Sequence, residues 1–287
     1  MGDGTLLPNF LGIGVPRAGT TWLHDLLVSH PHVRMPTVRK ELNYFDLNYH
    51  RGIDWYERCF ERGSAGEPRA VGEITPVYVY SAECLERVRD LGTVERFILC
   101  VREPVDLLWS GYKQNAAIDN FRGDLREFIQ ARPDVVANGF YARAIRPWLA
   151  EFGVERFLFL RFEEMFGDVD QTKRTVGKFL GVDPELFPAA AGRRQVNRSY
   201  TPRFPRAYSL AKRTVTVLHR ADLSWVVALG KRVGLRRVVG REASESDDDN
   251  SMLSAEGRRR LRDLYRDDLV EFGRLTGQDL SSWIDQN

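Results

Sequence analysis

A glycine-rich turn between an apolar run and a helical pattern is the feature that most constrains the fold. The apolar run "NFLGIGV" covers residues 9–15, and the helical pattern "TTWLHDLLVSH" covers residues 20–30. Gly14 and Gly19 lie between them at G-x-x-x-x-G spacing. A short apolar run that ends in glycine and leads into a helix is typical of a buried parallel strand, a tight turn and a helix. The pattern therefore predicts an α/β protein.

Further apolar runs repeat this arrangement along the chain. We expect three more buried strands within residues 70–80, 95–101 and 155–162. Helical patterns stand between them, for example at residues 104–114 and 141–152. Strands that alternate with helices favour a parallel sheet covered on both faces. We predict a three-layer fold in which helices flank a central parallel sheet.

The last part of the chain carries a long amphipathic pattern. Residues 254–277 predict a helix that Ser254 caps and that Gly277 ends. Its apolar face is expected to consist of four residues: Leu261, Leu264, Leu269 and Phe272.

The glycine turn also predicts a site for an anionic group. Backbone N–H groups and the positive end of a helix point at whatever lies at such a turn. A nucleotide triphosphatase places Lys and then Ser or Thr after the second glycine. Here Thr20 and Thr21 occupy those positions, and the cation of the turn is Arg17. The turn is P-loop-like without the lysine, and the alternative is a tight turn that binds nothing.

The third apolar run ends in a second cation. Magnesium-dependent nucleotidases place an acidic residue at the end of such a strand, whereas Arg102 stands here, and Ser110 follows two helical turns later. This arrangement favours a second anionic group and no obligatory metal. The alternative is a surface ion pair of Arg102 with Glu103 or Asp106.

Composition excludes several classes of function. The formal net charge of +2 is far below the basic excess of a nucleic-acid-binding domain, so no nucleic-acid partner is expected. The three cysteines include no C-x-x-C pair and the five histidines no H-E-x-x-H pair, which argues against a metal site. The first 15 residues lack the pattern of a signal peptide or membrane span, and we expect a cytoplasmic protein.

Two of these motifs resemble those of a known family. "VPRAGTTWL" resembles the 5′-phosphosulfate loop of sulfotransferases that use 3′-phosphoadenosine 5′-phosphosulfate (PAPS), and "VREPVDLLWSGY" resembles their 3′-phosphate motif. The likeness is greatest to the heparan sulfate sulfotransferases and their bacterial relatives. It continues in further segments, namely "KELNYFD", "NYHRGIDWYERCF", "GEITPVY", "GFYARAIRPWLAEF" and "LRDLYRDDLVEFGRLTGQDLSSW". The resemblance implies a P-loop-like α/β fold.

The resemblance implies roles for the residues that would bind PAPS. Arg17 takes the place of the family's loop lysine, where it contacts the 5′-phosphate and the bridging oxygen. Arg102 and Ser110 hold the 3′-phosphate. The remaining contacts to the 5′-phosphosulfate come from a run of five residues: Ala18, Gly19, Thr20, Thr21 and Trp22.

The resemblance also implies a general base. Glu41 in "KELNYFD" matches the family's catalytic glutamate, and the alternative is a surface carboxylate paired with Lys40 or Arg39. His50 is the better of two candidate histidines for a second base, because His24 is expected to be a structural residue on the first helix.

One position departs from the family pattern. Ile74 stands where the polysaccharide enzymes carry a lysine, although Glu73, Thr75 and Pro76 match their motif. The acceptor therefore need not resemble heparan sulfate.

The chain is thus expected to be a single sulfotransferase domain over residues 1–287. We expect it to transfer a sulfuryl group from PAPS to a hydroxyl of a carbohydrate, glycolipid or small molecule, with an amine as the less favoured acceptor. An ATP-dependent small-molecule kinase and an inactive nucleotide-binding module are the alternatives. Residues 200–252 predict a mostly helical insertion with an acidic loop. Its basic part, residues 203–241, could be an acceptor-side lid, a surface for an anionic membrane or partner, or a solvated helix pair.

Overall fold

The computed structural model describes residues 6–60, 68–118, 121–193, 200–202, 240–242 and 254–285. The chain forms two compact units. The first unit comprises Met1–Leu107, Asn138–Val196 and Arg259–Asn287, and the second comprises Leu108–Ala137 and Asn197–Arg258.

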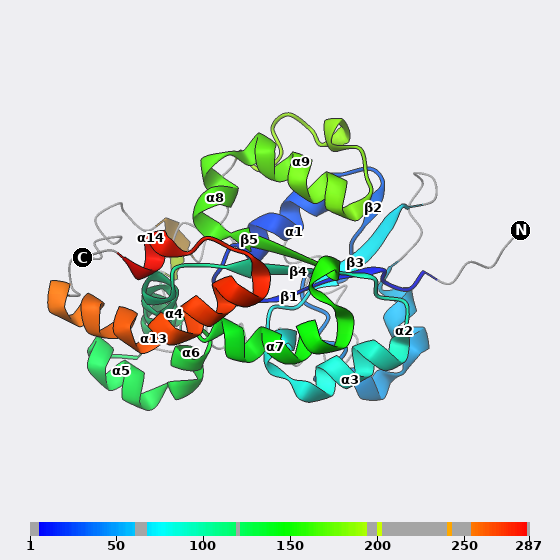
Figure 1. Cartoon of the computed structure of the whole chain (residues 1–287). Coiled ribbons are helices and arrows are strands. Elements are labelled where there is room, and N and C mark those ends of the chain that lie inside the picture. The colour runs from blue at the N-terminus through cyan, green and yellow to red at the C-terminus, as the bar shows by residue number, and fades with distance from the viewer. Residues whose placement is uncertain are drawn as a thin grey trace, which may run out of the picture. The chain divides into compact units, whose positions relative to one another are not determined.

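A five-stranded parallel sheet forms the centre of the first unit (Figure 1), in the order β2-β3-β1-β4-β5. The strands are β1 (Phe10–Gly14), β2 (Val33–Arg34), β3 (Ala70–Ile74), β4 (Arg96–Val101) and β5 (Phe157–Arg161). The four predicted strands are confirmed. The strand β2 was not predicted, because two residues are too few to show an apolar run. All five residues of β1 and of β3 are buried, as expected for parallel strands covered on both faces.

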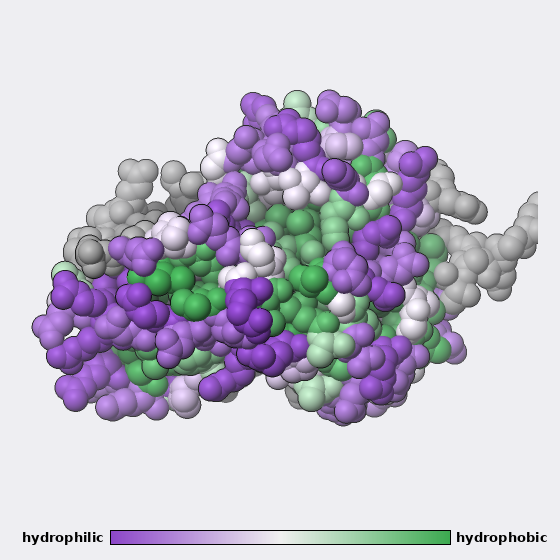
Figure 2. All heavy atoms as spheres, viewed as in Figure 1, coloured by the Kyte–Doolittle hydropathy of each residue, from purple (hydrophilic) through white to green (hydrophobic). Residues whose placement is uncertain are grey.

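Helices cover both faces of this sheet, which confirms the predicted α/β fold. Figure 1 shows α1, α8 and α9 on one face and α3 and α7 on the other. The helices of this unit are α1 (Thr20–Val28), α2 (Ile53–Arg58), α3 (Ala82–Leu91), α7 (Tyr141–Phe152), α8 (Phe162–Gly167), α9 (Val169–Leu180), most of α13 (Ala255–Thr276), and α14 (Ser281–Ile284). Short 3₁₀ helices are η1 (Tyr49–Arg51), η2 (Tyr78–Tyr80), η3 (Val154–Arg156) and η4 (Pro184–Leu186). In Figure 2, apolar residues gather between α9 and α7, over the β5 edge, and hydrophilic residues cover the outer faces of these helices.

The second unit contains most of α4 (Pro104–Ile118), together with α5 (Leu125–Ala131) and α6 (Pro133–Ala137). It also contains an antiparallel pair formed by β6 (Tyr200–Pro202) and β7 (Gly240–Glu242). The rest of the predicted insertion at residues 200–252 lies outside the described residues. None of the described helices is long and apolar enough to cross a membrane.

The C-terminal helix α13 begins and ends as predicted, but one residue of its predicted apolar face is exposed. The Ser254 hydroxyl accepts a hydrogen bond from the N–H of Gly257 at 3.1 Å, which caps the helix. The buried residues are Tyr265, Leu269 and Phe272, whereas Leu264 is 47% exposed. The prediction for Leu264 was wrong. The buried face contains Tyr265, Leu269 four residues later and Phe272 three residues after that, and Leu264 lies beside this face.

The order of the strands brings the predicted site residues to one edge. The carboxyl ends of parallel strands face the same side of a sheet, and β1 lies between β3 and β4. Gly14 ends β1 where a Cβ atom would lie 2.5 Å from Leu99 Cδ1, so only glycine fits there. The glycine turn, the segment after Glu73, and Arg102 therefore emerge at the same edge.

Candidate active site

The glycine turn exposes an uncapped helix N-terminus. The N–H of Val15 donates to the Cys100 carbonyl of β4 at 2.8 Å, which ties the turn to the sheet. Gly19, with a φ angle of 85°, is the N-cap of α1 and offers no side-chain acceptor. The first turn of α1 contains no acidic residue, although its N–H groups have no partner within the helix. This end of α1 suits an anionic group.

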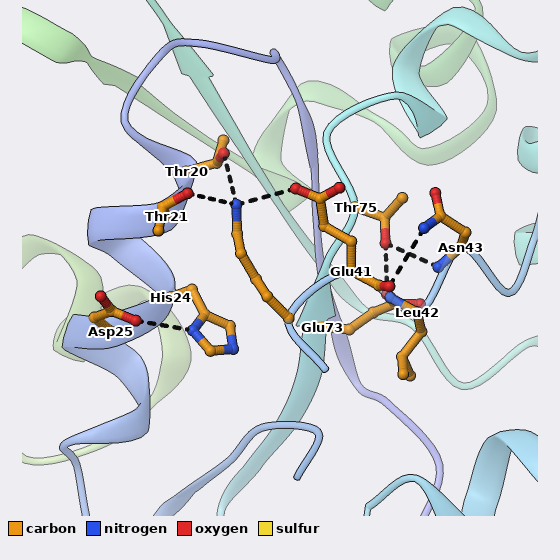
Figure 3. Close-up of polar contacts among 10 residues, drawn as sticks. Thr20, Thr21, His24, Asp25, Glu41, Leu42, Asn43, Glu73 and Thr75 are labelled. Atoms are coloured by element: carbon orange, nitrogen blue, oxygen red, sulfur yellow. Dashed lines mark hydrogen bonds and ion pairs between the residues drawn. The ribbon is translucent and has the colours of Figure 1, made fainter. Parts of the chain in front are cut away.

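A lysine ammonium lies at the start of this helix. The Nζ atom of Lys40 donates to Thr20 Oγ1 at 3.1 Å, to Thr21 Oγ1 at 3.0 Å and to Glu41 Oε1 at 3.2 Å (Figure 3). Burial lowers the pKa of Lys40, and the Glu41 carboxylate opposes that effect. The side chain of Lys40 is 19% exposed and that of Glu41 is 46% exposed. The ion pair of Glu41 with Lys40, which was the alternative to a catalytic role for Glu41, is therefore present, and it lies against α1.

A buried carboxylate supports the segment that carries Glu41. Glu73 is fully buried and accepts hydrogen bonds from the hydroxyls of Thr75 at 2.7 Å, Tyr56 at 2.9 Å and Tyr78 at 2.9 Å. It also accepts from the N–H of Leu42 at 3.1 Å. Burial raises the pKa of Glu73 to about 7, and these hydrogen bonds act in the opposite direction.

The partners of Glu73 hold the next residues of the same segment. Thr75 Oγ1 accepts from the N–H of Asn43 at 3.3 Å (Figure 3), and the Tyr78 hydroxyl accepts from the N–H of Tyr44 at 2.7 Å. Three consecutive backbone N–H groups after Glu41 are thus bound to one polar cluster. This cluster was not predicted from the sequence, because it joins residues that are far apart in the chain.

The two candidate histidines lie in different surroundings. His24 is on α1, where its Nδ1 lies 3.3 Å from Asp25 Oδ1 and its buried Nε2 has no hydrogen-bond partner among the described residues. Burial lowers the pKa of His24. The charge of Lys40 also lowers this pKa, and the charge of Glu41 raises it. His24 is therefore not the fully satisfied structural histidine that we expected. His50 is exposed in η1, and no hydrogen bond of its ring to the described residues is present.

Arg102 follows β4 without forming the alternative ion pair. Its guanidinium lies over the ring of Phe162, 4.2 Å from the centroid, and its buried Nε has no hydrogen-bond partner among the described residues. Instead, Oε1 of Glu103 lies 3.7 Å from Nε of Arg262, and Oε2 of Glu103 accepts from the N–H of Asp106 at 2.7 Å. A buried donor of this kind fits an anionic ligand.

Arg17 lies within electrostatic reach of Arg102. Burial lowers the pKa of Arg17, and the positive charge of Arg102 lowers it further. Arg17 also adopts a left-handed backbone, with a φ angle of 71°. Two cations that approach each other at a helix N-terminus favour an anion between or beside them.

Trp22, Ala18 and Ser110 were also predicted to contact PAPS. The Trp22 indole is buried and donates to the Gly192 carbonyl at 2.8 Å, so its ring serves packing. Ala18 is fully buried in the turn. Ser110 is buried in α4 within the second unit, and its pairing with Arg102 stays a prediction.

A cavity lies away from these residues. It has a volume of about 890 Å³ and is lined by Arg96, Arg156, Arg174 and Lys178 among others. It is close to the amino ends of β4 and β5, whereas ligands of open α/β sheets bind at the carboxyl ends. Among the described residues, no group of three or more His, Cys, Asp or Glu side chains could hold a metal ion.

Comparison with known proteins identifies the family. Residues 7–200 match the family model described as sulfotransferase domain. The chain is 28% identical over 282 residues to mouse heparan sulfate glucosamine 3-O-sulfotransferase 3B1, which covers 95% of this chain and 64% of that protein. It is 27% identical over 302 residues to human bifunctional heparan sulfate N-deacetylase/N-sulfotransferase 3, which covers 98% of this chain and 31% of that protein. The chain thus spans less than two thirds of either relative.

A solved structure shares the fold. The sulfotransferase from Alicyclobacillus acidocaldarius superposes with a TM-score of 0.67 at 21% identity, over 96% of this chain and 98% of that one. The match of the family model over most of the chain is consistent with the glycine turn and the cations around it. The chain belongs to the sulfotransferase domain family.

Proposed function

We propose that this protein transfers a sulfuryl group from PAPS to an acceptor hydroxyl. The observation that carries the proposal is the hydrogen-bond network that joins Lys40 and Glu41 to the first turn of α1, at a helix start without a side-chain cap. Membership of the sulfotransferase domain family supports it.

The residues at this edge of the sheet fit a ligand with two separate anionic groups. The first-turn N–H groups of α1, the hydroxyls of Thr20 and Thr21, and Arg17 would hold the 5′-phosphosulfate. Arg102, with its buried Nε, would hold the 3′-phosphate. When bound, PAPS supplies an activated sulfuryl group and leaves as adenosine 3′,5′-bisphosphate.

Glu41 takes the proton of the acceptor. Its half-exposed carboxylate can reach a hydroxyl from solvent, unlike the fully buried Glu73. Glu41 accepts that proton as the acceptor oxygen forms its bond to sulfur. Arg17 stabilises the electron pair that stays on the bridging oxygen as the sulfur–oxygen bond breaks.

The acceptor class is proposed from the relatives. Both names refer to heparan sulfate, which favours a carbohydrate acceptor. The name of the 3-O-sulfotransferase favours a hydroxyl of that carbohydrate, whereas the name of the N-sulfotransferase favours an amine. Ile74 is fully buried at the end of β3 and offers no charge to a polyanion. A test panel therefore includes desulfated heparan oligosaccharides, glycolipids and small alcohols.

Transfer of radioactive sulfur tests the proposal. The parent protein, incubated with ³⁵S-labelled PAPS and the panel, should label at least one acceptor. Glu41→Gln should lower the rate by about 10²- to 10⁴-fold, because it removes the general base. Glu83→Gln, at an exposed carboxylate on α3, is the matched control and should keep the parent rate. Equal rates for Glu41→Gln and the parent would remove Glu41 from the mechanism.

A further inference from the structure

Lys40 connects the two parts of the proposed site. Its ammonium is held by two hydroxyls from the first turn of α1 and by the carboxylate of Glu41. The donor side and the acceptor side of the reaction therefore meet at this one nitrogen atom.

The surroundings of Lys40 make its charge effective. Its side chain is mostly buried, and lysines are seldom buried without a partner. Glu41 lies 3.2 Å away and favours the charged form. A charge in such a partly dry position interacts more strongly with a neighbouring anion than it would in water.

The same hydrogen-bond network keeps donors that an anion could use. Each threonine hydroxyl that accepts from Lys40 keeps its own proton, which it can donate to an anionic oxygen. The N–H groups of the same helical turn point toward that position. An anion at the start of α1 would therefore lie against these hydroxyls and beside the ammonium.

We propose that Lys40 is a catalytic residue that contacts the transferring sulfuryl group. It stays protonated and forms no covalent bond. In the complex, its ammonium turns one N–H from a threonine hydroxyl to the sulfuryl oxygens. It holds them there as the acceptor oxygen bonds to sulfur, the bond from sulfur to the bridging oxygen of PAPS breaks, and Glu41 receives the acceptor's proton. This inference rests on the proposed function and extends it to a residue that otherwise reads as a surface ion-pair partner.

Calorimetric titration without an acceptor separates this role from a structural one. PAPS and adenosine 3′,5′-bisphosphate are each titrated into the parent, Lys40→Met and Lys40→Arg. Lys40→Met should lose affinity for PAPS by about tenfold more than for the bisphosphate, which is the effect of one lost hydrogen bond between charged groups. Lys40→Arg should restore part of the difference.

Lys173 provides a matched control. It is also buried, at 5% exposure, and donates to the carbonyls of Pro188 and Ala189 and to the carboxylate of Asp170. Lys173→Met should lower the melting temperature and leave the ratio of the two affinities unchanged. With an acceptor present, Lys40→Met should lower kcat by about 10²-fold, the usual effect of removing one donor to a developing charge.

Two outcomes would overturn the inference in different ways. If Lys40→Met weakens both nucleotides equally and lowers the melting temperature as Lys173→Met does, Lys40 only ties α1 to the Glu41 segment. If the parent binds neither nucleotide, the proposed function is wrong and the role of Lys40 falls with it.

Discussion

At the scale of single residues, the most constrained group is the carboxylate of Glu73. It accepts four hydrogen bonds and holds the segment that follows Glu41. Its burial raises its pKa from 4.5 to about 7. The folded protein therefore binds a proton at Glu73 between these pH values more readily than the unfolded chain does.

This shift predicts how stability depends on pH. Because the folded-state pKa is raised, the contribution of Glu73 is fully present below about pH 4.5 and is lost as the pH rises through about 7. Glu73→Gln removes this titration, so its free energy of unfolding should fall less between pH 5 and 8, by as much as about 3 kcal/mol. Denaturant unfolding of both proteins across this range measures the difference. Parallel pH profiles for the two proteins would contradict the assignment.

The candidate site could be predicted from sequence where one local motif contains it. Local sequence patterns predict the positions of Gly19, Thr20 and Arg102, because each lies at the end of a strand or the start of a helix. The Glu73 cluster could not be predicted, because it needs Tyr56 and Leu42, which only the folded sheet brings together. For the same reason the contacts of Lys40 with α1 were missed.

At the scale of elements, the turn before α1 depends on the left-handed backbone of Gly19. Gly92, which follows α3, has a similar φ angle of 73°, and a Cβ atom there would meet nothing within 4 Å. A Cβ atom at Gly19 would lie 2.6 Å from Cε of the buried Met165. The two glycines differ in packing and share a conformation.

Alanine at these two glycines should therefore have different effects. Gly92→Ala should cost about 1–2 kcal/mol of stability for the left-handed conformation alone. Gly19→Ala should cost more, because Met165 must move, and should weaken binding of adenosine 3′,5′-bisphosphate by at least about tenfold as the first-turn N–H groups shift. Thermal unfolding and calorimetry check both effects. Unchanged nucleotide binding in Gly19→Ala would show that the turn is not the anion site.

Most elements follow from local patterns, and the exceptions have physical causes. The apolar runs predicted β1, β3, β4 and β5, and the helical pattern at residues 141–152 is α7. The strand β2 has two residues and is defined by its pairing with β3. The error at Leu264 arose because several residues of α13 are apolar, and the partner element decides which of them are buried.

At the scale of the whole molecule, the C-terminal helix completes the core of the sheet unit. The ring of Phe272 lies 5.7 Å from those of Tyr141 on α7 and Phe159 on β5, centroid to centroid. Asp268 on the same helix accepts from the N–H groups of Ala142 and Arg143 at the start of α7. Residues near the end of the chain thus stabilise a helix that lies more than 100 positions earlier.

These contacts predict a large difference between two positions of α13. Phe272→Ala should lower the free energy of unfolding by about 3–5 kcal/mol, because Phe272 is fully buried. Leu264→Ala should change it by less than about 0.5 kcal/mol, because Leu264 is half-exposed. Denaturant unfolding measures both values, and a larger loss at Leu264 would mean that the two faces of α13 are reversed.

If this edge of the sheet binds PAPS, it must bind a 3′-phosphorylated nucleotide without magnesium, and calorimetric titration measures that binding. Two titrations are made into each of the parent, Arg102→Ala and Arg96→Ala. One uses adenosine 3′,5′-bisphosphate in a buffer that contains a metal chelator, and the other uses ATP with magnesium. Arg96 begins β4 at its opposite end and is the matched control. We predict that the bisphosphate binds the parent and Arg96→Ala without magnesium, and binds Arg102→Ala at least about tenfold more weakly. Magnesium-dependent binding of ATP, with no binding of the bisphosphate, would mean that PAPS is not the ligand and would identify the turn as that of a kinase.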